Sequence, residues 1–122
     1  KKDGNTIWVD AYNANPSSMK SAVENFAEMQ GAGKVLILGD MFELGTDSNN
    51  EHQSLATLIE NKKCWESVYL VGKEFGKTTS SAQRFETTEA LIEWLAAHPL
   101  KDKTILLKGS RGMAMERVLE KL

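Results

Sequence analysis

Side chains that could bind a nucleotide, an amine or an anion follow three separate apolar runs of the chain. They are Asp10, Asn13 and Asn15 after the first run, Asp40 and Glu43 after the second, and Lys108, Ser110 and Arg111 after the third. Ligands of an open parallel α/β sheet bind outside the carboxyl ends of its strands, which all lie along one edge. If the three runs are parallel strands, these polar residues therefore face a single site although they are far apart in the sequence.

The first of these groups lies in the stretch VDAYNANPSSM, from Val9 to Met19, which is typical of a strand, a polar loop and the start of a helix. Asn15 is a favourable N-cap, and Pro16 is tolerated at the first helical position because its missing N–H has no intrahelical partner there. Asp10 and Asn15 also belong to the residue types that favour turns and caps. A purely structural role for both residues is therefore the alternative to ligand binding.

The third group, Lys108-Gly109-Ser110-Arg111, leads into a helical pattern and suggests an anion site. The free amides and the dipole of a helix N-terminus favour a negative charge. Lys108 would add a point charge, and Arg111 a bidentate fork for a carboxylate or phosphate. The alternative is that Ser110 is a simple N-cap with solvated basic neighbours.

The apolar pattern along the chain alternates between strands and helices. We expect strands at residues 6–9, 34–39, 67–72, 83–85 and 104–108. We expect helices at residues 16–30, from a Ser48–Glu51 capping box, at residues 73–79, from a Thr87 cap to His98-Pro99, and after Gly112. This alternation predicts a Rossmann-like three-layer αβα sandwich with a mostly parallel sheet of five to six strands.

Length and composition fit one globular domain that covers residues 1–122. The chain is 41% hydrophobic and 26% charged, with a net charge of -2, and it contains no basic run, so we expect no nucleic-acid partner. We also expect no membrane partner, because no apolar run approaches the ~20 residues of a membrane span and no signal peptide is visible. Cys64 is the single cysteine and is expected to be a small packed residue in a reducing, cytoplasmic setting. The chain opens on the polar turn KKDGN without an initiator Met, so we expect it to be one domain of a longer protein.

Several chemical motifs are missing from the sequence. There is no G-x-x-x-x-G-K-[ST] loop for a triphosphate and no G-x-G-x-x-G for a dinucleotide. His52 and His98 have no metal-ligand spacing with Cys64, and we expect a satisfied buried role for His52 and a helix-end role for His98. No nucleophile–base pair is recognised. The sequence therefore predicts a domain that binds and orients a substrate while much of the reaction machinery lies elsewhere.

Three motifs, in this order, resemble the C-terminal domain of the Mur ligases. They are VDAYNANPSSM, then LILGDMFELG followed by Glu51-His52, then LLKGSRGMAMERV, and together they extend over essentially the whole chain. Within the family, the Y-N-A-N loop with G-D-M-x-E-L-G and K-G-S-R is typical of the branch that adds D-alanyl-D-alanine to UDP-N-acetylmuramoyl-tripeptide.

The resemblance implies an ATP-dependent, three-domain bacterial ligase of peptidoglycan precursor synthesis that forms a peptide bond through an acyl phosphate. Its N-terminal domain holds the UDP-sugar, and its central domain carries the phosphate-binding loop, the Mg²⁺ ligands and most of the ATP site. The C-terminal domain brings in the amino substrate and closes over the nucleotide. The isolated domain is therefore expected to be inactive.

The resemblance also implies roles for single residues. Asp10 takes the position that reaches the ATP ribose, and Asn13 and Asn15 line the cleft near the amino substrate. Lys108, Ser110 and Arg111 would help to hold the dipeptide or the charge that develops near it. Supporting positions that match the family pattern without an assigned role are Tyr12, Asp40, Glu43 and His52. No catalytic residue and no metal ligand is expected in this chain.

Two alternatives come from other classes of protein. A receiver-like phospho-switch is also a small parallel α/β unit with acids and a Lys at strand ends. Against it, Asp10 has no acidic neighbour, Asp40 ends the second strand rather than the third, and Lys108 precedes Gly rather than Pro. A stand-alone flavodoxin-like binding module is the other alternative, and the sequence upstream of Lys1 in the parent reading frame would distinguish it from a ligase domain.

Overall fold

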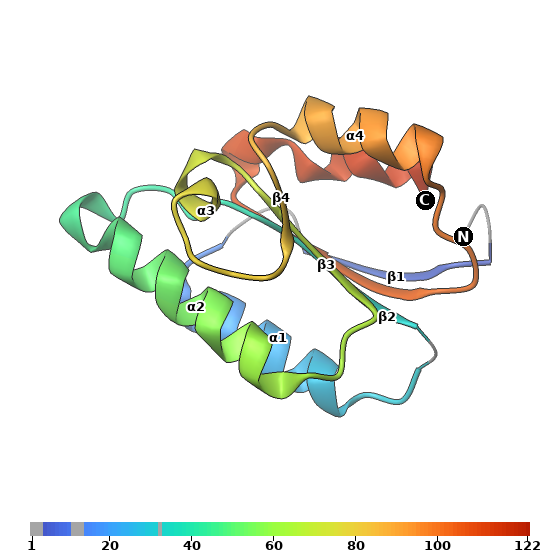
Figure 1. The fold of residues 1–122 in the computed structure, drawn as a ribbon, viewed down its shortest axis with the longest axis horizontal. Coiled ribbons are helices and arrows are strands. Elements are labelled where there is room, and N and C mark those ends of the chain that lie inside the picture. The colour runs from blue at the N-terminus through green and yellow to red at the C-terminus, as the bar shows by residue number, and fades with distance from the viewer. Residues whose placement is uncertain (1–3, 11–13, 32) are drawn as a thin grey trace.

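Five strands form one sheet in which every neighbouring pair is parallel (Figure 1). The computed structural model describes residues 4–10, 14–31 and 33–122, and for Asp10 and Arg111 only the backbone is described. The strands are β1 (Thr6–Asp10), β2 (Lys34–Gly39), β3 (Ser67–Val71), β4 (Gln83–Phe85) and β5 (Thr104–Lys108), in the order β1-β5-β2-β3-β4. The predicted fold class and all five predicted strands are confirmed.

The last strand in sequence lies between the first two. Asp10 is level with Lys108 in the β1–β5 pairing, and Leu38 is level with Lys108 in the β2–β5 pairing. The carboxyl ends of β1, β5 and β2 therefore lie side by side at one edge of the sheet, as the sequence predicted.

Helices cover both faces of the sheet (Figure 1). Helices α1 (Pro16–Glu28) and α2 (Ser48–Lys62) pack on one face, while α4 (Thr88–Ala97) and the 3₁₀ helix η3 (Met115–Lys121) pack on the other. The shorter elements are η1 (Gly45–Asp47), α3 (Lys73–Gly76) and η2 (Arg111–Met113). No helix in the described ranges is long and apolar enough to cross a membrane.

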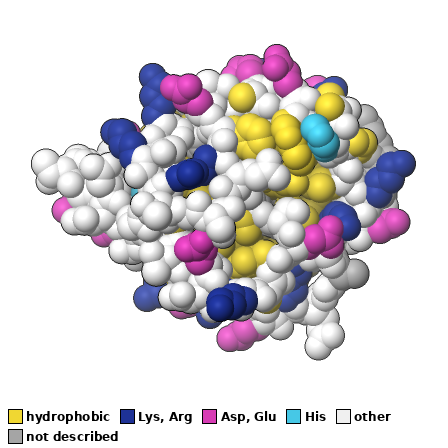
Figure 2. All heavy atoms as spheres, in the orientation of Figure 1, with side chains coloured by type: hydrophobic (Ala, Val, Ile, Leu, Met, Phe, Trp, Pro, Cys, Tyr) yellow, Lys and Arg dark blue, Asp and Glu magenta, His cyan; other side chains and the backbone are white. Residues whose placement is uncertain are grey.

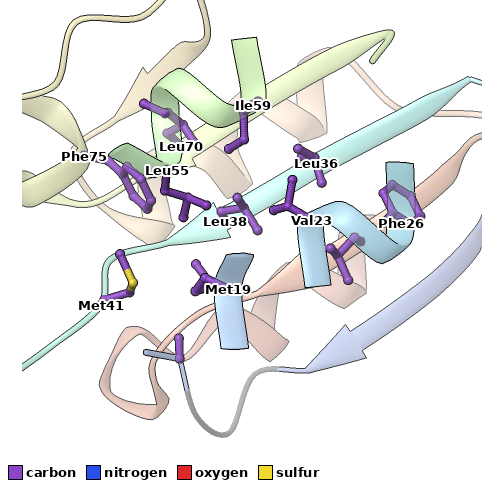
Figure 3. Packing of buried hydrophobic residues seen from close by; sticks show 13 residues of the cluster. Met19, Val23, Phe26, Leu36, Leu38, Met41, Leu55, Ile59, Leu70 and Phe75 are labelled. Atoms are coloured by element: carbon purple, nitrogen blue, oxygen red, sulfur yellow. The ribbon is translucent and has the colours of Figure 1, made fainter. Parts of the chain in front are cut away.

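Alternate side chains of β2 enter the two halves of the core. Leu36 and Leu38 pack with Val23 and Phe26 of α1 on one face, where Figure 3 shows these side chains pointing toward one another. Val35 and its neighbours on the same side of β2 pack beneath α4 and η3. β2 is thus buried on both faces, which explains why its sequence is a continuous apolar run.

The ends of two helices differ from those predicted. α1 ends at Glu28 rather than at residue 30, because Met29 leaves the helix in an extended conformation with φ -73° and ψ 149°. The prediction of a capping box at Ser48 and Glu51 is wrong. Ser48 is the first residue of α2 rather than its N-cap, and η1 directly precedes it. The Ser48 hydroxyl instead donates to Glu74 Oε1 at 2.7 Å.

Three further expectations need correction. The helix predicted for residues 73–79 is shorter, because α3 ends at Gly76. The predicted final helix consists of the two 3₁₀ segments η2 and η3, separated by Ala114 in the left-handed region at φ 54°, although Met115 and Val118 point inward as expected. Cys64 is exposed rather than packed, since it follows the left-handed C-cap Lys63 where α2 ends.

A matched pair of Val→Ala substitutions tests the assignment of buried and edge positions. Val35 in β2 is fully buried, whereas Val9 in the edge strand β1 is 46% exposed. We expect Val35→Ala to lower the free energy of unfolding by about 2–3 kcal/mol, from lost apolar burial and the cavity left behind. Val9→Ala should cost less than about 1 kcal/mol. Urea unfolding measures both values, and equal costs would contradict the described core.

Candidate functional site

The backbone brings the three predicted groups of site residues to one edge. Asp10 is the last residue of β1, Lys108 is the last of β5, and Arg111 begins η2 just beyond it. Asp40 directly follows β2 on the other side of β5. The chain leaves β1 and β2 toward helices on one face and leaves β5 toward η3 on the other, which is the arrangement at which parallel α/β sheets bind ligands.

Part of the predicted first group lies outside the described residues. This is the case for Asn13 and for its neighbour Tyr12, one of the supporting positions, while Asp10 is placed only by its backbone. Asn15 is described as the N-cap of α1: its Oδ1 accepts the Ser18 N–H at 2.9 Å, and the Ser18 hydroxyl accepts the Asn15 N–H at 3.1 Å. The structural interpretation of Asn15 as a cap is therefore confirmed, whereas its contact with a substrate stays a prediction.

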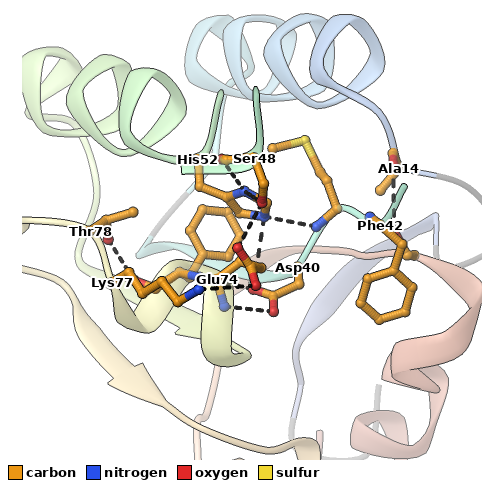
Figure 4. Close-up of polar contacts among 11 residues, drawn as sticks. Ala14, Asp40, Phe42, Ser48, His52, Glu74, Lys77 and Thr78 are labelled. Carbon is orange, nitrogen blue, oxygen red and sulfur yellow. Dashed lines mark hydrogen bonds and ion pairs between the residues drawn. The ribbon is translucent and has the colours of Figure 1, made fainter. Parts of the chain in front are cut away.

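Asp40 joins the end of β2 to the start of α3. Its carboxylate is 4% exposed and accepts the backbone N–H groups of Glu74 at 2.9 Å and Phe75 at 3.0 Å (Figure 4). Gly72 permits this approach, because a Cβ on it would lie 2.2 Å from the Asp40 carboxylate. Burial raises the pKa of Asp40 above its ordinary value, and this effect outweighs the lowering by the two amide hydrogen bonds.

His52 is fully buried and holds the residue after Asp40. Its Nε2 accepts the Met41 N–H at 3.0 Å, and its Nδ1 donates to the Ser48 carbonyl at 2.8 Å. An amide can only donate, so Nε2 is unprotonated and the imidazole is neutral. His52 Nε2 and Asp40 Oδ1 are 3.9 Å apart, and because the imidazole is neutral the two side chains do not form an ion pair. The expectation of a satisfied buried histidine is confirmed.

Ser110 connects loops that follow three different strands. Its side chain is buried, at 7% exposed; its hydroxyl accepts the Phe42 N–H at 3.2 Å and donates to the Ala14 carbonyl at 3.5 Å. Its own N–H donates to the Asp40 carbonyl at 3.4 Å. Neither the predicted anion-binding helix terminus nor the alternative N-cap describes these contacts, since only the short 3₁₀ turn η2 follows. The sequence held no signal for this bridge, because its partners are backbone groups distant in the chain.

Lys108 and Glu43 complete the described part of the predicted set. Lys108 is 1% exposed at the end of β5, and a lysine that is buried this deeply requires polar partners. Glu43 is exposed on the loop after β2 and adopts the left-handed conformation at φ 65°, which costs a non-glycine residue about 1 kcal/mol. Such strain often accompanies a functional loop.

A pocket of about 380 Å³ lies beside the loop after β2. It is lined by Glu43 and adjacent residues of that loop, and by Glu74 and Lys77 at α3. Its charged rim includes the Glu74–Lys77 ion pair, 3.5 Å between Oε2 and Nζ. A larger pocket, of about 600 Å³, lies at the end of α2 and the start of β3, away from every predicted site residue. Of these two pockets, the smaller adjoins the strand-end edge.

Two features of the described side chains bear on possible ligands: clusters of metal-ligating residues, and the distribution of charge on the face shown in Figure 2. No group of three or more His, Cys, Asp or Glu residues in the described ranges is arranged to hold a metal ion. Acidic and basic side chains are interspersed over the face in view in Figure 2, without a large region of one sign.

This fold belongs to the class of parallel α/β domains, in which ligands bind outside the carboxyl ends of the strands. The sequence matches the family described as Mur ligase, glutamate ligase domain, over residues 1–111. The chain belongs to the Mur ligase family.

Named relatives share this similarity over most of the chain. It is 35% identical over 122 residues to the UDP-N-acetylmuramoyl-tripeptide–D-alanyl-D-alanine ligase of Treponema pallidum, and 37% identical over 118 residues to that of Escherichia coli. Each alignment covers 93% of this chain and 26% of the relative. The crystal structure of the MurF ligase from Thermotoga maritima in complex with ADP superposes with a TM-score of 0.78 at 30% identity, covering 99% of this chain and 28% of that one. The chain thus spans about a quarter of the length of these proteins.

Replacing Asp40 with Asn tests the consequence of burying this carboxyl. Because its pKa is raised, the folded state binds the proton more tightly than the unfolded state does. The contribution of Asp40 to stability is therefore largest below its ordinary pKa and declines as the pH rises through the raised value. We expect Asp40→Asn, which removes one of two acceptors, to cost about 1–3 kcal/mol in urea unfolding. This cost should be smaller at about pH 7 than at about pH 4.

Glu74→Gln is the matched control, because its cost in the free energy of unfolding should change with pH in the opposite direction. The hydrogen bond from Ser48 lowers the pKa of Glu74, so its contribution is present above its ordinary pKa and is lost as the pH falls. Glu74 is 30% exposed, and we expect a cost below about 1 kcal/mol at neutral pH. If the two variants showed the same pH trend, the described electrostatics would be wrong.

Proposed function

We propose that this chain is the amino-substrate domain of an ATP-dependent ligase that joins D-alanyl-D-alanine to UDP-N-acetylmuramoyl-tripeptide in peptidoglycan precursor synthesis. The observation that carries the proposal is the convergence of the loops after β1, β2 and β5 at one edge of the sheet. The motifs on these loops are the ones that resemble the D-alanyl-D-alanine-adding branch. The names of the relatives from T. pallidum and E. coli support the same substrates.

In this proposal the remainder of the protein supplies the activated acid and this domain supplies the amine. Asp10 would contact the ATP ribose from the end of β1. Asn13 and Arg111, on the neighbouring loops after β1 and β5, would contact the dipeptide, and Lys108 would contribute positive charge near its carboxylate or near the charge that develops during attack. The pairing of Asp10 with Lys108 supports this division, because it puts the nucleotide side and the dipeptide side on adjacent strands.

The proposed reaction has two steps. The terminal carboxylate of the tripeptide takes the γ-phosphoryl group of ATP, which gives an acyl phosphate and ADP. The D-alanyl-D-alanine amine then attacks the acyl carbon, loses a proton and displaces phosphate, so that one amide bond forms for each ATP consumed. Mg²⁺ would offset the charge of the phosphates, and its ligands and most of the ATP site are proposed to lie outside this chain.

Orientation is the contribution that a separate amino-substrate domain can make. Holding an amine about 3–3.5 Å from an activated carbonyl can remove of order 7 kcal/mol or more of barrier. Closure of the domain over the nucleotide would also exclude water, which would otherwise hydrolyse the acyl phosphate. We place the reaction in the cytoplasm, in line with the single, exposed cysteine of the chain.

The receiver-like alternative finds no support at Asp40. A phospho-accepting aspartate needs an accessible oxygen, whereas both oxygens of Asp40 accept backbone N–H groups and its side chain is buried. The match to the Mur ligase family also removes the ground for a flavodoxin-like module.

Two substitutions in the full-length protein test the proposed contacts. We expect Asp10→Ala to raise KM for ATP and Arg111→Ala to raise KM for D-alanyl-D-alanine, each by roughly tenfold, the loss of one charged hydrogen bond. Lys101→Ala is the control, since exposed Lys101 precedes β5 at the opposite edge. Steady-state kinetics with each substrate varied in turn provides the measurement. Unchanged kinetics in both variants would refute the proposed contacts.

The 122-residue chain by itself should fold but not ligate. With ATP, Mg²⁺ and both substrates present, we expect neither ADP nor the extended peptide to accumulate, because the acyl phosphate would form in the rest of the protein. Full-length protein in the same assay is the positive control. Turnover by the isolated chain would show that the division of labour is wrong.

A further inference from the structure

The hydroxyl of Ser110 is committed to backbone groups rather than directed at a ligand. Its one proton lies toward the Ala14 carbonyl, it accepts the Phe42 N–H, and its side chain is only 7% exposed. The bond to Phe42, at 3.2 Å, is the shorter of the two, and the contact with Ala14, at 3.5 Å, is the weaker. A hydroxyl with its proton engaged and its surface covered is poorly placed to hold a substrate.

The position of Ser110 follows from the strand order. Because β5 lies between β1 and β2, a side chain just beyond β5 reaches the loops on both sides. The Ser110 N–H also donates to the Asp40 carbonyl, which continues the β2–β5 contact past the end of both strands. The Ser110 hydroxyl thereby joins the Phe42 N–H to the Ala14 carbonyl, and Figure 4 shows that Ala14 and Phe42 lie close together.

Each of the two loops that Ser110 holds carries or contacts a proposed ligand-binding residue. Ala14 is buried and lies between Asn13 and the N-cap Asn15. The Phe42 ring lies over Gly112, where an added Cβ would be 2.6 Å from it, and so it packs on the turn that contains Arg111. A shift of either loop would therefore move the proposed dipeptide contacts.

We infer that Ser110 is a positioning residue, whose hydroxyl sets the loops after β1 and β2 relative to the end of β5 so that the dipeptide amine is correctly presented. This inference rests on the proposed ligase function. It assigns to Ser110 a role distinct from the direct substrate contact that the family resemblance implies for it.

Amide hydrogen exchange of the 122-residue chain without substrates tests the bridge itself. We expect Ser110→Ala to accelerate exchange of the Phe42 N–H about tenfold, the effect of losing one buried hydrogen bond, and Ser110→Thr, which keeps a hydroxyl, to restore it. The Met41 N–H, held by His52, should not change. Ser80→Ala is the matched control, because the Ser80 hydroxyl also accepts a backbone N–H, that of Ala82, in a loop away from the strand-end edge.

Kinetics of the full-length protein tests the consequence. We expect Ser110→Ala to lower kcat/KM for D-alanyl-D-alanine about tenfold while KM for UDP-N-acetylmuramoyl-tripeptide is unchanged, with Ser110→Thr and Ser80→Ala resembling the wild type. In every variant, faster exchange of the Phe42 N–H must be accompanied by a lower kcat/KM for D-alanyl-D-alanine. Any variant in which Phe42 exchange accelerates without a loss of dipeptide kcat/KM, or the reverse, overturns the inference. If the wild-type protein had no ligase activity, the proposed function would be refuted. The exchange measurement does not depend on ligase activity, so it would still test the bridge made by Ser110.

Discussion

The parallel pairing of β5 between β1 and β2 is the constraint on which the candidate site depends. It makes residues from the two ends of the chain neighbours: Asp10 is level with Lys108, and Asp40 follows the strand on the other side. The pairing is stabilised by burial on both faces, because the two helical layers pack against opposite sides of the same central strands. The site is thus a consequence of the core rather than of contacts within any one loop.

Buried polar groups then fix what the core places. Asp40 ties β2 to α3, and neutral His52 holds the Met41 N–H from α2. Ser110 adds the Phe42 N–H from beyond β5. Three successive residues of one loop, Asp40 to Phe42, therefore have partners from three different parts of the chain, so the loop can keep a strained residue, Glu43, at its exposed turn. Such anchoring suits the role proposed for this surface, which is to hold an amine in a fixed orientation.

The sequence predicted the fold well because its signals were local and repeated. Apolar runs such as that of β2 and the N-cap pair of Asn15 and Pro16 are readable from a few adjacent residues. The predicted capping box at Ser48 failed because the hydroxyl finds a better partner in Glu74, far along the chain. Ala114 adopts the left-handed conformation that divides the last helix, although it is neither Gly nor Asn, the residues that favour this conformation.

The candidate site was predictable in its location but not in its internal contacts. Polar residues after apolar runs are visible in the sequence, and the parallel topology brings them together. Some of these residues have a structural role because they form hydrogen bonds to backbone groups that are distant in the chain. Such partners cannot be predicted from composition, as the buried Asp40 and Ser110 show. The motif resemblance added the proposed substrate class, which spacing and periodicity alone do not contain.

A crystal structure of the full-length protein with ADP and D-alanyl-D-alanine tests the central claim most directly. We expect the dipeptide to lie against the loops after β1 and β5, with its amine directed toward the remainder of the protein and the nucleotide ribose next to the end of β1. A dipeptide bound at the opposite edge of the sheet, or in the pocket between the end of α2 and the start of β3, would contradict it.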